Sequence, residues 1–199
     1  MAKHHVHVTN VKQKHTKFII KKGKTMIRYV FSDPHFDHVS IIENAKRPFK
    51  NVTEMNNTII ERYNAVVGKK DLCYWLGDIM YDATKEKVQK ILSRMHGYKC
   101  LILGNHDRNH SECWWRDCGF DKVFKHPVYD AENYIMLSHE PLEEFGNIPK
   151  IANFHGHIHI NGYDFPEHEH CINVCVEKID YTPVLLKNPF IDKLREFER

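Results

Sequence analysis

The sequence predicts an α/β fold in which a largely parallel half is joined to a more antiparallel half. Between residues 29 and 107, short apolar runs alternate with helical patterns in the order β-α-β-α-β. That order favours a parallel sheet with helices packed on it. Beyond residue 120, four apolar runs follow one another with little helix between them. The 199 residues, of which 42% are hydrophobic, suit one domain with a substantial core.

The amino-terminal region divides into a polar segment and a predicted hairpin. Residues 1–16 are polar, and we expect them to be flexible. Residues 17–33 contain two apolar runs around a Lys-Gly turn, which predicts two antiparallel strands ending at Asp33. Residues 17–199 are therefore expected to form a single domain.

Two helices are predicted between the strands of the first half. Asn51 and Glu54 form an N-terminal capping pattern, and the helix that follows is expected to stop at Gly68. Thr84 opens the second helix, which is expected to end at Gly97. The buried strands of this half are "DLCYWLGD" and "KCLILGNHD".

The second half is predicted to contain four strands and a last helix. The strands are "KVFKHPVYD", "NYIMLSHE", "IANFHGHIH" and "CINVCVEKI". Asn188 is expected to cap a helix that continues to the end of the sequence. Trp75 is expected in the core, whereas Trp114 and Trp115 either flank a functional site or pack a short helix.

Composition narrows the classes of function. A net charge of +3 and a pI near 8.4 tolerate an anionic substrate but are not typical of a dedicated DNA-binding surface. No signal peptide and no run of ~18 apolar residues is present, so we expect a cytoplasmic protein with reduced cysteines. Cys171 and Cys175 could suggest a zinc site, but a four-residue step along a strand spans ~13 Å, too far for one ion.

Polar side chains follow the apolar runs at the points where the strands end. These residues are Asp33, His35, Asp78, Asn105, His106, His139, His157 and His159. Ligands bind at the carboxyl ends of strands in open α/β sheets, so we expect one shared site. Gly77 and Gly104 precede two of these residues and allow the backbone to turn tightly beside a ligand.

The residue types indicate a metal centre. Oxygen and nitrogen donors without cysteine suit Mn, Fe, Zn, Ni or Co. Seven donors exceed the needs of one tetrahedral ion but suit two ions that share a carboxylate. His155, His157 and His159 alternate along a predicted strand, which would place the three imidazoles on one face. Neighbouring imidazoles on that face could then each reach a different ion.

Five short motifs occur in order along residues 29–176: Asp33-x-His35, Gly77-Asp78, "GNHD" at 104–107, His139 and "GHIH" at 156–159. Together they resemble the calcineurin-like metallophosphoesterase family. The segments "FSDPHFDH", "RPF" and "MNNTIIERYNAVV" further resemble a subgroup of small bacterial and phage phosphoesterases. The resemblance implies a four-layer α/β/β/α sandwich with mixed sheets.

The resemblance also implies a role for each residue of the site. One ion would be bound by Asp33, His35 and His159, and the other by Asn105, His139 and His157, with Asp78 bridging the two. His106 would be the catalytic histidine and Asp107 its orienting acidic partner. Two divalent transition-metal ions are implied, with Mn²⁺ expected first. The candidates for substrate binding are His38, Arg47, Arg108 and His155. Of these, His38 and His155 could instead orient a ligand.

The predicted activity is hydrolysis of a phosphodiester, with a phosphomonoester as second choice. Hydroxide bridging the two ions would attack phosphorus, and His106 would assist the leaving group. A nuclease or an RNA-end-processing enzyme is the alternative. A non-catalytic scaffold is disfavoured, because His106 is present with all seven ligands. We expect a phosphate ester as the partner, including nucleotides or nucleic acid, and neither a membrane nor an obligate protein partner.

Overall fold

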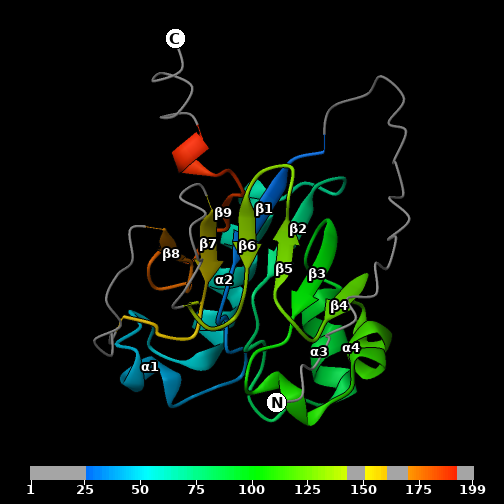
Figure 1. The fold of residues 1–199 in the computed structure, drawn as a ribbon. Helices are drawn as coiled ribbons and strands as arrows, with labels where there is room; N and C mark the ends of the chain where they lie inside the picture. Colours follow the sequence, from blue (N-terminus) through cyan, green and yellow to red (C-terminus); the bar gives the residue numbers. More distant parts are fainter. Residues whose placement is uncertain (1–25, 143–150, 161–169, 192–199) are drawn as a thin grey trace, which may run out of the picture.

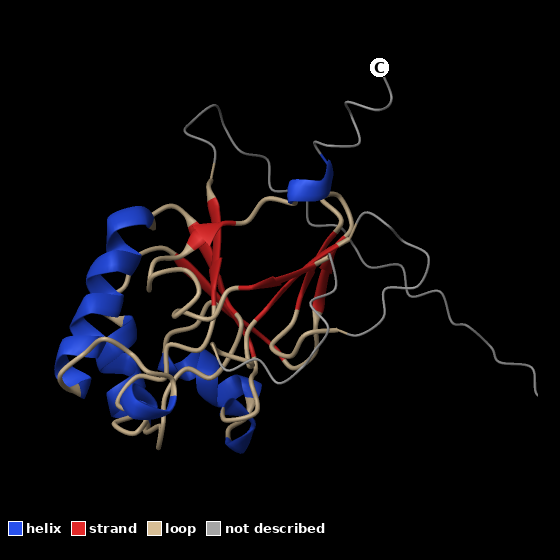
Figure 2. Ribbon diagram, turned by 90° about the vertical axis from the view of Figure 1, so that its left-hand side faces the viewer, coloured by secondary structure: helices blue, strands red, loops and turns tan. Residues whose placement is uncertain are grey.

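The computed structural model describes residues 26–142, 151–160 and 170–191. These residues form two β-sheets that pack face to face, with helices along one side (Figures 1 and 2). The first strand of the predicted hairpin and the predicted flexible segment, residues 1–16, lie outside the described residues.

The larger sheet has five strands in the order β4-β3-β2-β1-β9. Its members are β1 (Arg28–Phe31), β2 (Leu72–Trp75), β3 (Tyr98–Ile102), β4 (Lys122–Phe124) and β9 (Val184–Leu185). Strands β1 to β4 are mutually parallel, and β9 pairs antiparallel with β1. The predicted parallel half is therefore confirmed, and the carboxyl ends of β1, β2 and β3 share one edge.

The second sheet has four strands in the order β5-β6-β7-β8. They are β5 (Val128–Asp130), β6 (Ile135–Leu137), β7 (Ala152–His155) and β8 (Cys171–Asn173). The prediction of a more antiparallel half is wrong, because only β5 and β6 are antiparallel among these pairs. More than a dozen residues separate β6 from β7 and β7 from β8. Connections of that length allow the next strand to run parallel to the previous one.

One predicted strand divides between the two sheets. The segment "KVFKHPVYD" forms β4 at one end and β5 at the other, with Pro127 between them. Proline cannot donate a ladder hydrogen bond, so pairing is interrupted there and the chain crosses from one sheet to the other. Lys125, His126 and Pro127 in the middle of the segment mark this break, which the prediction of one strand overlooked.

Four α-helices that lie wholly within the described residues and a 3₁₀ turn accompany the sheets. They are α1 (Ile41–Asn44), α2 (Val52–Val66), α3 (Lys85–Leu92), α4 (Glu112–Cys118) and the turn η1 (Asp107–Asn109). The predicted caps are confirmed: the side chains of Asn51 and Thr84 accept backbone N–H bonds at the starts of α2 and α3. The helix predicted after Asn188 begins at residue 189, and its part beyond residue 191 lies outside the described residues.

The hydrophobic core has two parts. One lies between the five-stranded sheet and the helices, where Trp75 is buried against Phe31 and Tyr63 as predicted. The other lies between the two sheets and includes Val30 and Phe154. The predicted α/β sandwich of mixed sheets is confirmed, and the described residues show three of its four predicted layers (Figure 2). No helix in this described part of the chain is long and apolar enough to span a membrane.

Candidate metal centre

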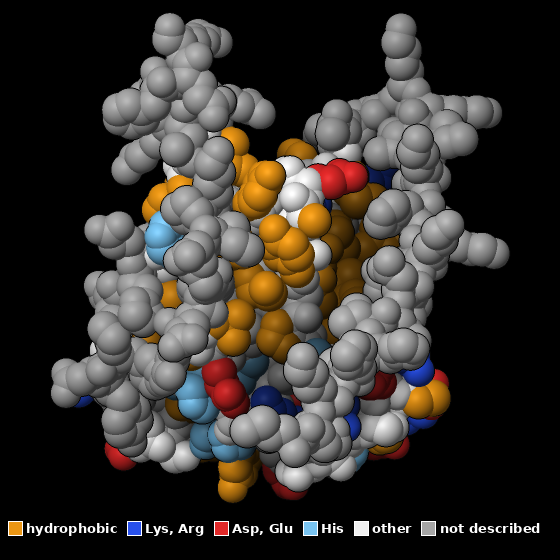
Figure 3. Space-filling model, viewed as in Figure 1, with side chains coloured by type: hydrophobic (Ala, Val, Ile, Leu, Met, Phe, Trp, Pro, Cys, Tyr) orange, Lys and Arg blue, Asp and Glu red, His pale blue; other side chains and the backbone are white. Residues whose placement is uncertain are grey.

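The two sheets meet at the edge where the candidate residues lie. Beyond the end of β1, the Ser32 N–H donates to the Val174 carbonyl (2.9 Å), and the Val176 N–H donates to the Ser32 carbonyl (3.0 Å). These bonds join the ends of β1 and β8, and Asp33 follows immediately. Figure 3 shows histidine side chains grouped beside an acidic side chain at this lower end of the molecule. Residues from both sheets therefore contribute to one site.

The first group of donors surrounds Asp33. His35 Nε2 lies 3.9 Å from Asp33 Oδ1 and 3.6 Å from Asp78 Oδ2, and His159 Nε2 lies 3.7 Å from Asp33 Oδ1. Asp33 Oδ1 and His35 Nε2 are buried without a hydrogen-bond partner. Two unpaired buried polar atoms that face each other are costly unless a cation lies between them. We refer to Asp33, His35 and His159 as the first half-site.

The second group of donors lies on the other side of Asp78. His139 Nε2 is 3.5 Å from Asp78 Oδ1, 2.9 Å from Asn105 Oδ1 and 3.2 Å from His157 Nδ1. His157 Nδ1 is in turn 3.0 Å from Asn105 Oδ1. We refer to Asn105, His139 and His157 as the second half-site.

Asp78 connects the two half-sites through different oxygens, Oδ2 towards the first and Oδ1 towards the second. Ligand atoms about 2.1 Å from one ion lie roughly 3–3.4 Å from each other. The observed separations are close to this range, so the residues fit two divalent ions. The structure thus brings together all seven predicted ligands.

The backbone around the site is unusual. Five of the seven predicted ligands have positive φ: Asp33, His35, Asp78, His157 and His159. Each such residue costs about 1–3 kcal/mol, and such residues cluster at functional sites. The two predicted glycines are also explained: a Cβ on Gly77 would meet the backbone of Gly104, and one on Gly104 would meet the carboxylate of Asp78.

The electrostatics of the two buried carboxylates differ. Burial disfavours the charged form of Asp33, but His139, His159 and His35 outweigh it and lower its pKa to about 2. For Asp78, burial and the neighbouring charge of Asp33 raise the pKa despite the attraction of His139. Two acids this close share positive neighbours, which is the electrostatic setting of a cation site.

Three of the histidines are oriented through Nδ1, which leaves Nε2 facing the site. His139 Nδ1 donates to the Leu76 carbonyl at 2.7 Å, and His159 Nδ1 lies 3.0 Å from Glu177 Oε1. His35 Nδ1 lies 3.2 Å from His38 Nδ1. Histidine ligands commonly donate their second nitrogen in this way, which fixes the tautomer. The candidate role of His38 as an orienting residue is therefore supported by its contact.

Arg47 does not have the role expected of it. Its side chain is fully buried, and the guanidinium donates to the carbonyls of Asp33 and Pro34 and to Glu177 Oε1. Since its N–H groups are used inside the protein, the prediction that Arg47 contacts a phosphate is wrong. Arg47 instead fixes the backbone that carries the first half-site.

Asp107 also differs from expectation. It is completely buried, and its two oxygens accept from the backbone N–H groups of Asp78, Ile79 and Gly104. Burial and the charge of Asp78 raise the pKa of Asp107 to about 6, against the effect of these N–H groups. The predicted role as partner of the His106 ring is therefore wrong: Asp107 holds the loops that carry Asp78 and Asn105.

His106 lies at the border between the site and solvent. Its side chain is half-exposed, and Nε2 is 3.9 Å from Asp78 Oδ2. The backbone N–H of His106 donates to Asp78 Oδ1 at 3.0 Å, so the loop is held independently of the ring. The ring is therefore accessible to solvent beside the Asp78 carboxylate.

The strand that carries His155 ends at that residue. β7 spans Ala152–His155, and the positive φ values of His157 and His159 take them out of a strand conformation. The prediction that three imidazoles share one strand face is therefore wrong. His155 is only 2% exposed, which excludes direct substrate contact in this conformation and leaves the alternative of a supporting residue.

Two further predicted residues have simple outcomes. Arg108 is exposed at the rim, where it makes a 3.5 Å ion pair with Glu140, so it remains accessible to a substrate.

Cys175 donates to Asp33 Oδ2, whereas Cys171 contacts the Leu142 carbonyl. Among the candidate metal groups of the described residues, Cys175 occurs with Asp33 and His159.

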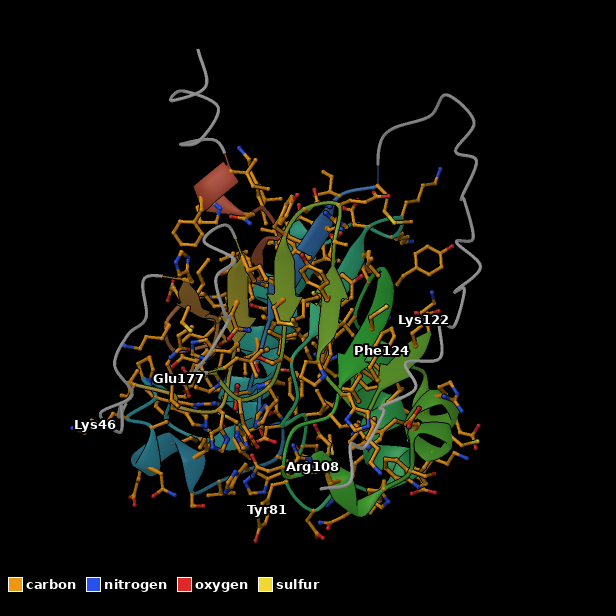
Figure 4. The ribbon with its side chains drawn as sticks, in the orientation of Figure 1. Lys46, Tyr81, Arg108, Lys122, Phe124 and Glu177 are labelled. Carbon is orange, nitrogen blue, oxygen red and sulfur yellow. The ribbon has the colours of Figure 1, made fainter. Side chains whose placement is uncertain are left out.

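Sequence reasoning missed Glu177 and Tyr81. Glu177 contacts Arg47 and His159, which are far from it in sequence, and its place two residues after Cys175 carried no recognisable signal. Tyr81 stacks on His38 with ring centroids 4.4 Å apart. The one sequence signal that could have found Tyr81 is its position three residues after Asp78. Figure 4 labels both side chains.

Comparison with known proteins identifies the family. The family model for calcineurin-like phosphoesterases matches residues 28–189. The chain belongs to the calcineurin-like phosphoesterase family. It is therefore a metal-dependent phosphoesterase, and the fold and family inferred from the five motifs are confirmed.

The chain is also similar to three individual proteins whose names give no activity. An uncharacterized protein of Methanocaldococcus jannaschii is 37% identical over 168 residues, covering 79% of the chain and 86% of the relative. The Gene 66 protein of Mycobacterium phage L5 is 37% identical over 129 residues, covering 55% of the chain and 61% of the phage protein. The crystal structure of a protein of unknown function from Aquifex aeolicus matches with a TM-score of 0.64 and 25% identity, covering 85% of this chain and all of that one.

Proposed function

We propose that this phosphoesterase hydrolyses phosphodiesters at a dinuclear centre of divalent transition-metal ions, with Mn²⁺ as the first candidate. The proposal rests on one observation: two groups of donor atoms converge on the two different oxygens of Asp78. Nitrogen and oxygen donors of this kind suit Mn, Fe, Zn, Ni or Co. When bound, the ions would supply Lewis acidity and an activated water.

The chain itself supplies the binding geometry and the proton. Asp33, His35 and His159 would hold one ion, and Asn105, His139 and His157 the other. In hydrolysis a bond forms between phosphorus and the water oxygen, and the bond to the leaving oxygen breaks. His106, with Nε2 3.9 Å from Asp78 Oδ2 and its side chain half-exposed, would give a proton to that oxygen. Arg108 at the rim would pair with a phosphate oxygen in exchange for Glu140.

A diester is preferred over a monoester because of the role given to His106. General acid catalysis helps most where the leaving group is poor, and the alcohols released from natural phosphodiesters are unactivated. An unactivated alkoxide of a diester leaves poorly without a proton. A histidine beside the bridging carboxylate therefore contributes most to diester hydrolysis.

Replacement of the His106 side chain tests this function. In metal-reconstituted protein, we expect His106→Ala to reduce the rate on an unactivated phosphodiester by ~10²–10⁴. With bis-nitrophenyl phosphate the loss should be much smaller, because nitrophenolate departs without a proton. Metal content should remain, because the contact of residue 106 with Asp78 Oδ1 comes from the backbone.

The substrate comparison provides the control. Wild-type protein loaded with each candidate metal is assayed on diesters and on monoesters of the same alcohols. Equal losses on both diesters with metals bound would contradict proton donation by His106. Higher kcat/KM on the monoesters would contradict the diester preference.

We also infer a cytoplasmic location. All six cysteines are free in the structure, and Cys73, Cys100, Cys118 and Cys175 are buried as thiols. Reduced, unpaired cysteines are typical of that compartment.

A further inference from the structure

A cavity of about 410 Å³ opens beside His106. It lies between the segment after β2 and the segment after β3, and its wall is formed by Met80, Tyr81, Asp82, Ala83, His106, Asn109 and His110. His106 lines this cavity, and its Nε2 lies 3.9 Å from Asp78 Oδ2. The cavity is therefore next to the candidate metal centre. It lies on the side where His106 would meet the leaving group.

The aromatic walls of the cavity are supported from behind. Tyr81 is 52% exposed, and its ring stacks on His38 with an interplanar angle of 15°. His110 stacks on Trp114 with centroids 3.7 Å apart and an angle of 7°. The buried Trp115 packs against Trp114 and donates from Nε1 to the Asp107 carbonyl. Trp114 therefore lies behind His110 at the edge of this cavity, whereas Trp115 is buried and packs the helix α4.

The two walls are also joined to each other and to the fold. His110 Nε2 donates to the Ala83 carbonyl at 3.3 Å, which ties the second segment to the first. The Tyr81 N–H donates to the Phe36 carbonyl at 3.1 Å. The flat rings are thus held in place before any ligand arrives, which reduces the entropy cost of binding.

The chemistry of the lining selects among ligands. Asp82 is the charged side chain in the wall besides the titratable histidines, so a second phosphate group would be repelled there. Met80 is buried and Ala83 is small, so the lining lacks the aliphatic surface that an acyl chain needs. Flat rings with the amide of Asn109 beside them suit a planar, neutral group with hydrogen-bonding edges.

We propose that this cavity binds a nucleobase on the leaving-group side of the scissile phosphate, so that the substrate is a nucleoside phosphodiester. This inference rests on the proposed diesterase function for its orientation. Tyr81 and His110 would provide the stacking surfaces, and Asn109 the edge contact. Figure 4 shows Tyr81 and Arg108 at the same lower end of the molecule, where a phosphate and its leaving group would lie.

Binding of adenosine, with ribose as the reference, tests the cavity directly. By equilibrium dialysis with the metal-loaded protein, we expect adenosine to bind and ribose not to bind. Tyr81→Ala should weaken adenosine binding about 5- to 150-fold, the factor that base–aromatic stacking supplies. Tyr81→Phe should retain binding, because the phenyl ring still stacks. Tyr98→Ala is the matched control, since Tyr98 is 51% exposed at the opposite end of β3.

A kinetic comparison separates this inference from the proposed function. The ratio of kcat/KM on a dinucleoside monophosphate to that on glycerophosphocholine should fall in Tyr81→Ala and stay constant in Tyr98→Ala. An unchanged ratio, or adenosine binding that does not depend on Tyr81, would overturn the cavity assignment. Adenosine binding through Tyr81 in a protein that hydrolyses neither diester would support the cavity and contradict the diesterase function.

Discussion

The two half-sites differ in depth and in what supports them. In the first, Asp33 and His35 are buried, and His159 is backed by the carboxylate of Glu177. In the second, Asn105 and His157 are exposed, and His139 is backed by a neutral carbonyl. A charged partner raises the basicity of a histidine ligand more than a neutral one does. We therefore expect the first half-site to bind its ion more tightly and the second to exchange its ion and contact the substrate.

The support of the first half-site is a small network of buried charges. Glu177 Oε1 contacts both His159 and Arg47, and Arg47 also holds the backbone carbonyl of Asp33. In this network Arg47 balances the charge of Glu177 inside the protein, where an unpaired carboxylate would be costly. Glu177 Oε2 is buried without a hydrogen-bond partner, so the contacts of this carboxylate are made through Oε1. The Glu177 side chain is only 3% exposed, whereas that of Arg108 at the rim is 53% exposed; Figure 4 labels both.

Removal of the bridging carboxylate should have the largest effect, because it abolishes the distinction between the half-sites. We expect Asp78→Ala to leave at most one ion per chain and to reduce activity to background, since two cations would lose the negative charge between them. Metal analysis of fully loaded protein measures this. Asp117→Ala, which removes an exposed aspartate of α4, is the control and should retain two ions.

Two ions bound to the Asp78→Ala protein would contradict the bridging role. A wild-type protein that takes up one ion when fully loaded would contradict the dinuclear site itself.

Loss of the Glu177 charge should affect one half-site only. Glu177→Gln keeps the shape and an oxygen for His159 Nδ1 but removes the negative charge. We expect the tighter of two metal-binding steps to weaken about 10- to 100-fold, the range seen for such supporting residues. The weaker step should be unchanged, and a calorimetric metal titration resolves the two.

The control for Glu177 is a carboxylate in another ion pair. Asp130→Asn removes the acid that pairs with Arg28 at 2.6 Å, away from the metal centre. Both variants are expected to lose some thermal stability, but only Glu177→Gln should change the tighter metal step. Equal weakening of both steps in Glu177→Gln would show that the half-sites are not supported separately.

The grouping of the candidate ligands was predictable because it follows from the order of the strands. Parallel strands place their carboxyl ends at one edge, so Asp33, Asp78 and Asn105 had to lie close together. Contacts between distant segments were not predictable. Arg47 donates to Glu177, which is 130 positions away, and no sequence pattern in either segment indicates this ion pair. For this reason the sequence analysis predicted that Arg47 contacts the substrate, whereas Arg47 binds the backbone carbonyls of Asp33 and Pro34.

The strand assignments failed where backbone conformation overrides residue pattern. Alternating histidines predicted a strand through His159, but Gly156 and the positive φ of His157 turn the chain after His155. The same turn brings the His157 N–H to Asp33 Oδ2 at 3.0 Å. The turn thus depends on a partner 124 positions away, and side-chain periodicity contains no information about it.

His155 offers the smallest expected effect and the finest test of how the half-sites are divided. Its ring is buried, with Nδ1 donating to the Gly156 carbonyl at 3.0 Å, and burial lowers its pKa. Nδ1 is used by the backbone, and none of the candidate metal groups in the described residues includes His155. We therefore expect His155→Ala to keep both metals and to change activity by roughly tenfold or less, at the low end of effects from supporting residues.

Thermal stability should fall in His155→Ala, because a buried ring is replaced by a cavity. His155→Asn, which can still donate to the Gly156 carbonyl, should keep activity closer to wild type if that bond is what matters. Metal analysis and kcat on one diester measure both variants. Loss of an ion in His155→Ala would mean that the turn after β7 needs this ring to hold His157. In that case the second half-site, despite its exposure, would depend on buried support as much as the first does.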